Sequence, residues 1–492
     1  THDEPHHNLV WEINKKIYSN FFLNTNYDII FPDYGMTFYG IGFQMFSIPF
    51  EVIIKLFYSL FNDASNINSY VIKHPSIVFL FLLSGIFFKK IIFLITKDNF
   101  FSQISAILYL SYPYLFGHSL FNTLDIPFLS IWLICTYLII RISLKFLKTN
   151  TLFLKDIYLL ALLTAFLLSI RISGVLIFFQ YLFFLIFTLN SLKLKIFSFI
   201  KLIYKEFLIF LSILIFFFFL LHPNYWENPF KVYDSMRYMS QHIQTACTIT
   251  LGESMCAQKL PPSYILIWLF FKLPILILFG CFLFPIVEKK IFFNINNKIV
   301  LGSLISTVLL IIFLLIFFNI NLYDEIRQIM FLVPLIFIIS LICIYSYKKK
   351  ISYYLIIFFI LFFSIQNIKI FPYNYLWLNN FSTITKVNNK FELDYWGVST
   401  RKISNYFNSL EDVQGCIISN RNDGIKAFLN KKICFLNFKD LYKKNNRPFY
   451  VVLTERALNK GLPINCSNIL NEFFKMNYSK EKIFVAKIYK CI

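Results

Sequence analysis

Residues 157–190 read IYLLALLTAFLLSIRISGVLIFFQYLFFLIFTLN, and this stretch decides the fold class of the chain. It holds two apolar runs, 157–170 and 173–190, with one basic residue, Arg171, between them. An apolar helix of about 20 residues crosses the ~30 Å hydrocarbon core of a bilayer. The stretch therefore predicts two membrane-spanning helices joined by a turn too short to form a loop.

Similar apolar runs recur along the whole chain. Of its 492 residues, 58% are hydrophobic and 15% are charged, whereas soluble domains carry about 25% charged residues. Transmembrane strands alternate in polarity and these runs do not, so the spans are expected to be helical. We therefore expect an all-α polytopic membrane protein. The ten predicted spans are 73–95, 103–117, 126–146, 157–170, 173–190, 207–221, 263–287, 299–319, 328–347 and 351–369.

The formal net charge of +21 is distributed unevenly. Basic residues cluster in alternate connections between spans, which is the pattern of cytoplasmic loops. The clusters are Lys89, Lys90 and Lys97; Arg141, Lys145, Lys148 and Lys155; Lys193, Lys195, Lys201 and Lys205; Lys289, Lys290 and Lys298; and Lys348, Lys349 and Lys350. The charge is therefore a topology signal, and nucleic acid is not an expected partner. We expect a further helix ahead of Thr1, which would complete eleven spans.

Three regions follow from this topology. Residues 1–72 form the first outward loop, with an acidic motif and two segments, 8–25 and 36–61, that lie in the outer interface as amphipathic helices. Residues 73–369 form the transmembrane domain, and residues 370–492 form a small soluble α/β domain that faces outward. The elements predicted in this last region are strands at 416–419, 433–437, 449–454 and 483–489 and a helix at 400–410.

The cysteines agree with this assignment. Of nine, three lie in predicted spans and six fall in outward regions. The six are Cys247, Cys256, Cys416, Cys434, Cys466 and Cys491. An even number of outward cysteines suits an oxidising compartment, and we expect at least one disulfide among them, although the spacing does not determine the pairing.

Polar residues gather on the outward side. The candidates are Asp3, Glu4, Asp125, Arg171, Arg327, and the loop 222–229 with His222, Tyr225 and Trp226. Each has a structural alternative. Asp3 and Glu4 would belong to a solvated or tag-like terminus. Asp125 would serve as a helix N-cap before Pro127, and Arg171 would reach the lipid headgroups. Trp226 would belong to an interfacial aromatic belt, and Arg327 would pair only with its acidic neighbours.

Carboxylates deprotonate hydroxyl groups or hold metal ions, and guanidinium and imidazole groups bind phosphate. Both kinds of group are predicted on one face of the membrane. Their combination at a bilayer surface fits a sugar donor linked to a lipid phosphate and an acceptor that arrives from water.

The order of these motifs resembles the membrane glycosyltransferases of the GT-C fold, in particular the protein O-mannosyltransferase and aminoarabinose transferase type of glycosyltransferase family 39. That family has an acidic pair in its first outward loop, matched by Asp3-Glu4. A second acidic residue before a proline is matched by Asp125, and a basic residue between the next two spans is matched by Arg171. Further similar stretches are His222 to Pro229, Leu260 to Tyr264, Tyr323 to Arg327 and Asp394 to Gly397.

The resemblance implies an inverting glycosyltransferase that uses a polyprenyl-phosphate sugar. Asp3 would be the general base, Glu4 would orient the site by pairing with Arg171, and Asp125 would position the acceptor or a metal. The donor-binding set would be Arg171, His222, Tyr225, Trp226 and Arg327. No cofactor is certain; a divalent metal is left open, with His6 and His7 as candidate ligands.

The other expected partners are membrane lipid and a protein, lipid or glycan acceptor. The predicted location is a bacterial inner membrane, with the site facing the periplasm. The rival interpretation is a multi-pass transporter or flippase for a lipid-linked or anionic solute, which predicts polar residues through the membrane midplane. A third is a non-catalytic assembly subunit that docks through the 370–492 region.

Overall fold

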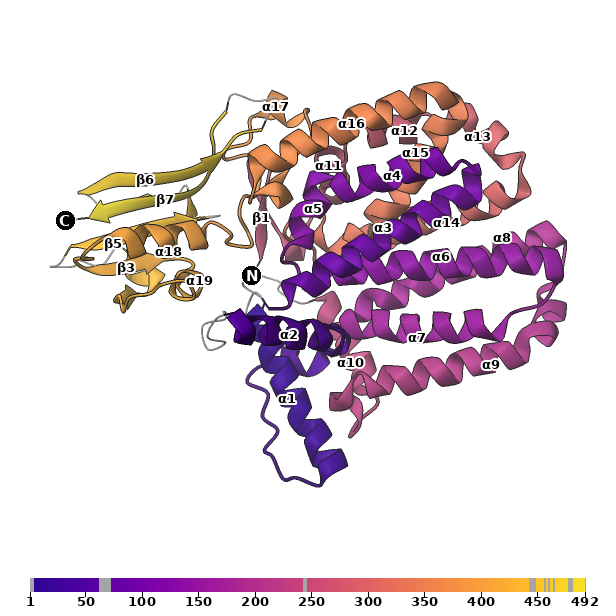
Figure 1. The fold of residues 1–492 in the computed structure, drawn as a ribbon, viewed down its shortest axis with the longest axis horizontal. Coiled ribbons are helices and arrows are strands. Elements are labelled where there is room, and N and C mark those ends of the chain that lie inside the picture. The colour runs from indigo at the N-terminus through magenta and orange to yellow at the C-terminus, as the bar shows by residue number, and fades with distance from the viewer. Residues whose placement is uncertain are drawn as a thin grey trace.

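The computed structural model describes residues 4–61, 72–241, 246–441, 448–454, 457–458, 461–462, 465–476 and 481–491. Long helices run side by side, and a β-sheet lies beyond one end of this bundle (Figure 1). The helices α1 (Glu4–Leu23), α2 (Gly42–Phe61) and α10 (Lys231–Ser240) gather at the same end. The fold is that of a polytopic helical membrane protein, as predicted.

Helices occupy most of each of the ten predicted spans, but 103–117 is divided between two helices and 263–287 among three. The bundle consists of α3 (His74–Thr96), α4 (Asn99–Ser111), α5 (Pro113–Ser119), α6 (Asp125–Thr149), α7 (Leu154–Ile170), α8 (Ile177–Leu192), α9 (Ile196–Leu220), α11 (Ser263–Lys272), α12 (Ile275–Phe282), α13 (Phe284–Phe292), α14 (Ile295–Phe317), α15 (Val333–Tyr347) and α16 (Lys349–Ile370). Within the described residues, eight helices are long and apolar enough to cross a membrane, or nine if one bent pair counts as a span.

One of these eight helices is α2, which the sequence pattern places at the interface instead. Pro49 interrupts its hydrogen bonding, and several of its large apolar side chains are exposed. Figure 1 shows α2 at the end of the bundle, next to α1. The interfacial placement of α2 stays a prediction.

The expectation of one continuous span over 263–287 is wrong. The chain bends by 118° between α11 and α12, where Leu273 is extended ahead of Pro274. Proline lacks the N–H that a continuing helix needs and disfavours helical backbone in the residue before it. The side-chain amide of Asn379 donates to the carbonyl of Leu273 at 2.9 Å. It therefore satisfies a polar group that the break exposes inside the bundle.

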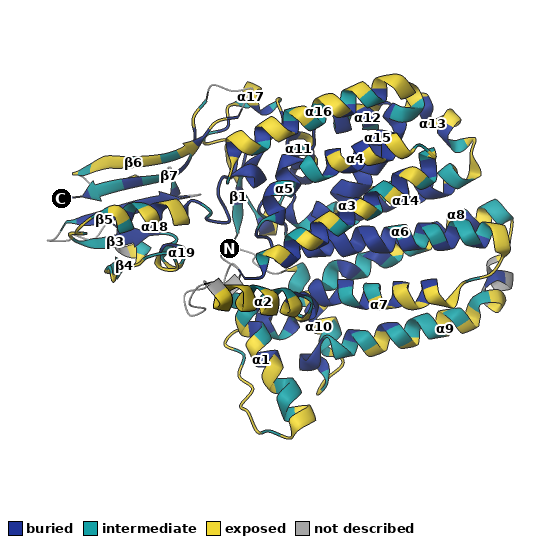
Figure 2. Ribbon diagram, in the orientation of Figure 1, coloured by how far each residue is buried: buried dark blue, intermediate teal, exposed yellow. Residues whose placement is uncertain are grey.

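Two helices form the centre of the bundle. Figure 2 shows α6 and α15 buried along most of their length, whereas α9 and α16 on the outside are largely exposed. Asp125 is the first residue of α6, and Arg327 begins the 3₁₀ segment Arg327–Leu332 that leads into α15. The two central helices thus begin with charged residues at the same end of the bundle.

The described part of the C-terminal region contains a five-stranded sheet in the order β4-β3-β5-β7-β6. The strands are β3 (Cys416–Ser419), β4 (Phe435–Leu436), β5 (Phe449–Thr454), β6 (Cys466–Phe474) and β7 (Ile483–Cys491), and α18 (Thr400–Ser409) is the predicted helix. The first three strands are parallel and the last two pair antiparallel. Strand β6 was not predicted because it is a polar, largely exposed edge strand.

The six cysteines outside the predicted spans form three disulfides, which confirms the expectation of at least one. Cys247–Cys256 closes the hairpin of β1 (Cys247–Thr250) and β2 (Glu253–Cys256). The second pair, Cys416–Cys434, joins β3 to the residue before β4, and the third, Cys466–Cys491, joins β6 to β7. Cys135, Cys281 and Cys343 are free thiols within the bundle.

Candidate active site

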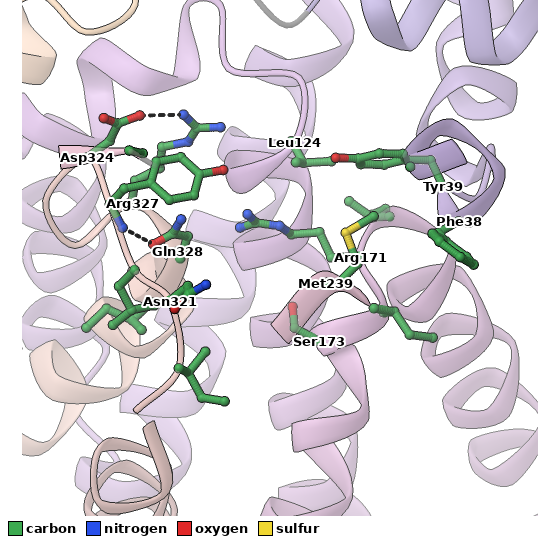
Figure 3. A pocket seen from close by; sticks show the side chains of 18 of the residues that line it. Phe38, Tyr39, Leu124, Arg171, Ser173, Met239, Asn321, Asp324, Arg327 and Gln328 are labelled. Carbon is green, nitrogen blue, oxygen red and sulfur yellow. Dashed lines mark hydrogen bonds and ion pairs between the residues drawn. The ribbon is translucent and has the colours of Figure 1, made fainter. Parts of the chain in front are cut away.

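A cavity of about 610 Å³ lies at the end of the bundle that faces the sheet. Its wall comes from segments far apart in the sequence: the start of α1, residues 33–40, the break after α7, residues 320–331, the Tyr395-Trp396 pair and Arg421. Figure 3 shows Arg171 projecting from one wall toward the opposite wall, which carries Arg327 and Asp324. Part of the lining is apolar, including Ile172, Leu176, Leu315, Ile320 and Leu322. The cavity is therefore amphipathic.

Asp125 joins the two arginines of this cavity. Arg171 Nη1 lies 2.5 Å from Asp125 Oδ1, and Arg327 Nε lies 2.9 Å from Asp125 Oδ2. Arg327 Nη1 also contacts Asp324 Oδ2 at 3.1 Å. The Asp125 side chain is 1% exposed and that of Arg171 17%. The carboxylate thus lies behind the guanidinium groups, and the arginines face the cavity.

Local backbone geometry brings these groups together. Arg171 is extended, with φ −148° and ψ 132°, and it separates α7 from the 3₁₀ turn Ile172–Leu176. Asp324 and Glu325 both have positive φ, at 54° and 68°, which is an uncommon conformation for residues with side chains. The amide of Asp324 donates to Thr248 Oγ1 at 2.9 Å, and this bond helps to hold the turn.

Asn122, rather than Asp125, accepts hydrogen bonds from the amides that begin α6. Its side-chain oxygen accepts from the amide of Asp125 at 2.8 Å and from that of Leu124 at 3.1 Å. Its amide nitrogen donates to Asp125 Oδ2 at 2.8 Å. The alternative role of Asp125 as a simple N-cap is therefore not what the structure shows.

A second buried charge pair adjoins the first group. Lys272 Nζ lies 2.7 Å from Glu325 Oε2, and both side chains are almost fully buried. The Tyr395 hydroxyl donates to Glu325 Oε2 at 3.3 Å and contacts His118 Nε2 at 3.2 Å. Burial raises the pKa of Glu325 to about 8, although the Lys272 ammonium lowers it. The sequence motifs did not include Lys272, although its position as a lone charge inside an apolar run could have indicated it.

The loop residues assigned to the donor lie elsewhere. His222, Tyr225 and Trp226 are not among the residues that line the cavity. The ring of His222 stacks on that of Tyr225 with centroids 4.9 Å apart, and its Nδ1 contacts the carbonyl of Phe218 at 2.8 Å. A Cβ on Gly40 would approach His222 Nε2 to 2.6 Å, so the imidazole packs directly beneath the cavity segment 33–40.

Tyr225 and Trp226 also support neighbouring segments. The Tyr225 hydroxyl donates to the carbonyl of Phe38 at 3.1 Å. Trp226 Nε1 donates to the carbonyl of Phe219 at 2.7 Å, and its ring contacts Tyr18 and Phe21 of α1. The structure therefore places these two residues as supports of the cavity segment and of α1.

The acidic motif lies at the start of α1. Asp3 is outside the described residues, and of Glu4 the structure describes the backbone, as the first residue of α1. His6 and His7 follow within one turn and line the cavity, and both rings contact Tyr39 edge-on. Among the described residues, no group of three or more His, Cys, Asp or Glu side chains is arranged to hold a metal ion.

Comparison with known proteins finds similar solved structures and no sequence relative. No family model matches the chain, and no curated protein matches it. ArnT from Cupriavidus metallidurans bound to undecaprenyl phosphate aligns over 99% of this chain and 98% of its own, with 12% identity and a TM-score of 0.45. The apo form of ArnT aligns over 100% and 99%, with 11% identity and the same TM-score.

At this identity and TM-score the likeness assigns no activity to the chain. The function proposed below rests on the cavity and its charged residues.

Proposed function

We propose that this protein is an inverting glycosyltransferase that moves a sugar from a polyprenyl-phosphate donor to an acceptor hydroxyl on the outer face of the membrane. The observation that carries the proposal is the pairing of Arg171 and Arg327 across Asp125 at the wall of an amphipathic cavity. A donor of this class needs a cationic site for its phosphate and an apolar path for its chain.

The two guanidinium groups suit a phosphate that gains charge during the reaction. When the anomeric bond breaks, the leaving polyprenyl phosphate gains negative charge, and fixed cations in a site shielded from water stabilise it. Because Asp125 holds Arg171 and Arg327 in place, little reorganisation is needed at that moment. The apolar side chains Ile172, Leu176, Leu315 and Ile320 line the same cavity and offer a path for the prenyl chain.

The acceptor would be activated by the acidic motif. Asp3 is proposed as the general base that takes the proton of the acceptor hydroxyl. The support is indirect: His6 and His7, within one helical turn of the motif, line the cavity. Glu4 would orient this end of the site. Asp125 is proposed as a positioning residue, because its carboxylate is used by the two arginines.

The direct test is release of polyprenyl phosphate from a panel of polyprenyl-phosphate sugars by the purified full-length protein. Release from at least one donor is the expected result. Asp3→Asn should abolish turnover and keep donor binding, because the amide cannot take a proton, whereas Arg171→Ala should also weaken donor binding. Asp28→Asn, at an exposed position of the same outward region, is the matched control.

Three outcomes would contradict the proposal. Near-wild-type turnover in Asp3→Asn would move the role of base to another residue. If Asp3→Asn, Glu4→Gln and Asp125→Asn all release polyprenyl phosphate normally, the acidic residues are not the catalytic groups. If the wild-type protein releases no polyprenyl phosphate and a labelled donor crosses a proteoliposome membrane intact, the protein is a carrier and the glycosyltransferase proposal fails.

A further inference from the structure

Trp396 is a cavity residue that the sequence motifs left without a role. It is 4% exposed, and Cζ of Arg327 lies 4.1 Å from the centre of its ring. A guanidinium stacked on an indole face keeps its N–H donors in its own plane, directed past the ring edge. Together with the contacts of Arg327 to Asp125 and Asp324, the indole therefore helps to position the guanidinium group.

A tight turn holds Trp396 in this position. The carboxylate of Asp394 accepts hydrogen bonds from the amides of Val398 at 2.8 Å and Ser399 at 3.2 Å. The amide of Gly397 closes the turn on the carbonyl of Asp394 at 2.8 Å, with φ +69° at Gly397, where glycine is favoured. These hydrogen bonds fix the backbone of the turn, and the indole is almost fully buried. Trp396 is therefore held beside Arg327 before a ligand binds.

The indole N–H of Trp396 lacks an acceptor. Nε1 is buried and has no hydrogen-bond partner in the part of the chain that the structure describes. Leaving a buried donor unpaired costs about 1–3 kcal/mol. Since an indole N–H only donates, the missing partner must be an acceptor atom. Beside the cation of Arg327, the favoured acceptor is an anionic oxygen.

We propose that Trp396 contacts the substrate, and that its indole N–H donates to an oxygen of the donor phosphate bound at Arg327. This inference rests on the proposed function and adds a residue to it. On this proposal, the segment that follows α16 contributes a substrate contact to the cavity. Arg421 ties this segment to the C-terminal sheet, because its Nη2 donates to the carbonyl of Tyr395 at 2.9 Å.

The chain offers a matched control in Trp377. This indole is 1% exposed and its Nε1 also lacks a partner among the described residues, but it packs on Tyr112 and Phe363 and does not line the cavity. Trp396→Phe and Trp377→Phe each remove one buried N–H and keep an aromatic ring. They differ in whether the indole lines the cavity.

The test is binding of decaprenyl phosphate to the full chain in detergent. Trp396→Phe should weaken binding by about ten- to a hundredfold, the loss of one hydrogen bond to a charged oxygen, and Trp377→Phe should not. In wild-type protein with ¹⁵N-labelled indoles, the Trp396 N–H resonance should move downfield on addition of the lipid phosphate. If Trp396→Phe does not fold, that resonance is assigned by substituting the other five tryptophans.

The outcomes separate the two proposals. Wild-type protein that binds no decaprenyl phosphate, or Arg327→Gln that binds it unchanged, overturns the proposed function and this inference with it. Wild-type binding that is retained in Trp396→Phe, an unmoved Trp396 resonance, or an equal loss in both phenylalanine variants overturns the inference and leaves the proposed function in place.

Discussion

At the scale of single residues, Asp125 is the organising group of the site. It is almost fully buried, and two guanidinium groups share its carboxylate oxygens. A buried charge is costly unless it is paired. Removing the shared carboxylate takes this counterion from Arg171 and leaves Arg327 with Asp324. The same substitution therefore affects both stability and the placement of the arginines.

We expect Asp125→Asn to destabilise the protein by about 3–5 kcal/mol and to abolish sugar transfer. Thermal unfolding in detergent and donor turnover measure the two effects. The control is Asp156→Asn, because Asp156 is also buried and pairs with Arg141 and Lys145, but at the opposite end of α6. Normal turnover in Asp125→Asn would show that Arg171 and Arg327 act without the Asp125 carboxylate.

The position of His222 beneath the segment 33–40 favours a structural role over phosphate binding. Burial lowers its pKa to about 4, so the imidazole is neutral in the folded protein at pH 7. The unfolded chain binds this proton near pH 6.5, so the folded state loses stability as the pH falls from about 6.5 to 4, by at most ~1.4 kcal/mol per pH unit. His222→Gln should flatten the loss of stability in this window. An equally steep decline in the variant would contradict the assignment.

At the scale of elements, breaks in helices position the site. Arg171 lies in the extended break after α7, and Arg327 begins the 3₁₀ segment before α15. A residue inside a regular helix directs its side chain to a neighbouring helix, whereas a break lets it reach the end of the bundle. The bend between α11 and α12 similarly leaves Lys272 at the end of α11, next to Glu325.

The disulfides give a prediction for the outward elements. Alkylation of the denatured, unreduced protein from an oxidising compartment should modify Cys135, Cys281 and Cys343 alone, because the other six cysteines are paired. Reduction first should raise the count from three labels to nine by mass spectrometry. Labelling of all nine without a reductant would refute the pairing.

At the scale of the whole molecule, the proposed function requires that the end of the bundle with the cavity faces outward. The sheet, α1 and the cavity lie at one end, and the turn between α8 and α9 lies at the other (Figure 1). The lysines of 193–205 are thus far from the C-terminal region. This arrangement agrees with the orientation expected from the alternation of basic connections.

Cysteine-accessibility labelling in intact cells tests the orientation. Single cysteines introduced at Lys193 and at Lys402, both at positions outside the bundle core, should react with membrane-impermeant reagents from opposite sides of the membrane. Reaction of both from one side would overturn the architecture and, with it, the proposed outward site.

The sequence by itself determined the helical membrane fold, most helices of the bundle, four strands of the sheet and the presence of disulfides. These features follow from local hydrophobicity, charge and spacing. It also singled out Asp125, Arg171 and Arg327, because charges beside apolar runs are conspicuous. It did not show that one carboxylate joins both arginines, since a contact across 202 residues leaves no local pattern.

Only the tertiary structure decided which candidates share a cavity. Lys272 looked like a stray charge, and the stretch Asp394 to Gly397 gave no role to Trp396. In the structure Lys272 pairs with Glu325 and Trp396 contacts Arg327, whereas His222 and Trp226 lie outside the cavity lining, against the segment 33–40 and α1. The physical reason is that a side chain's role depends on what surrounds it after distant segments pack. Local sequence sets the polarity and backbone preference of a residue, and the packing of the bundle sets its partners.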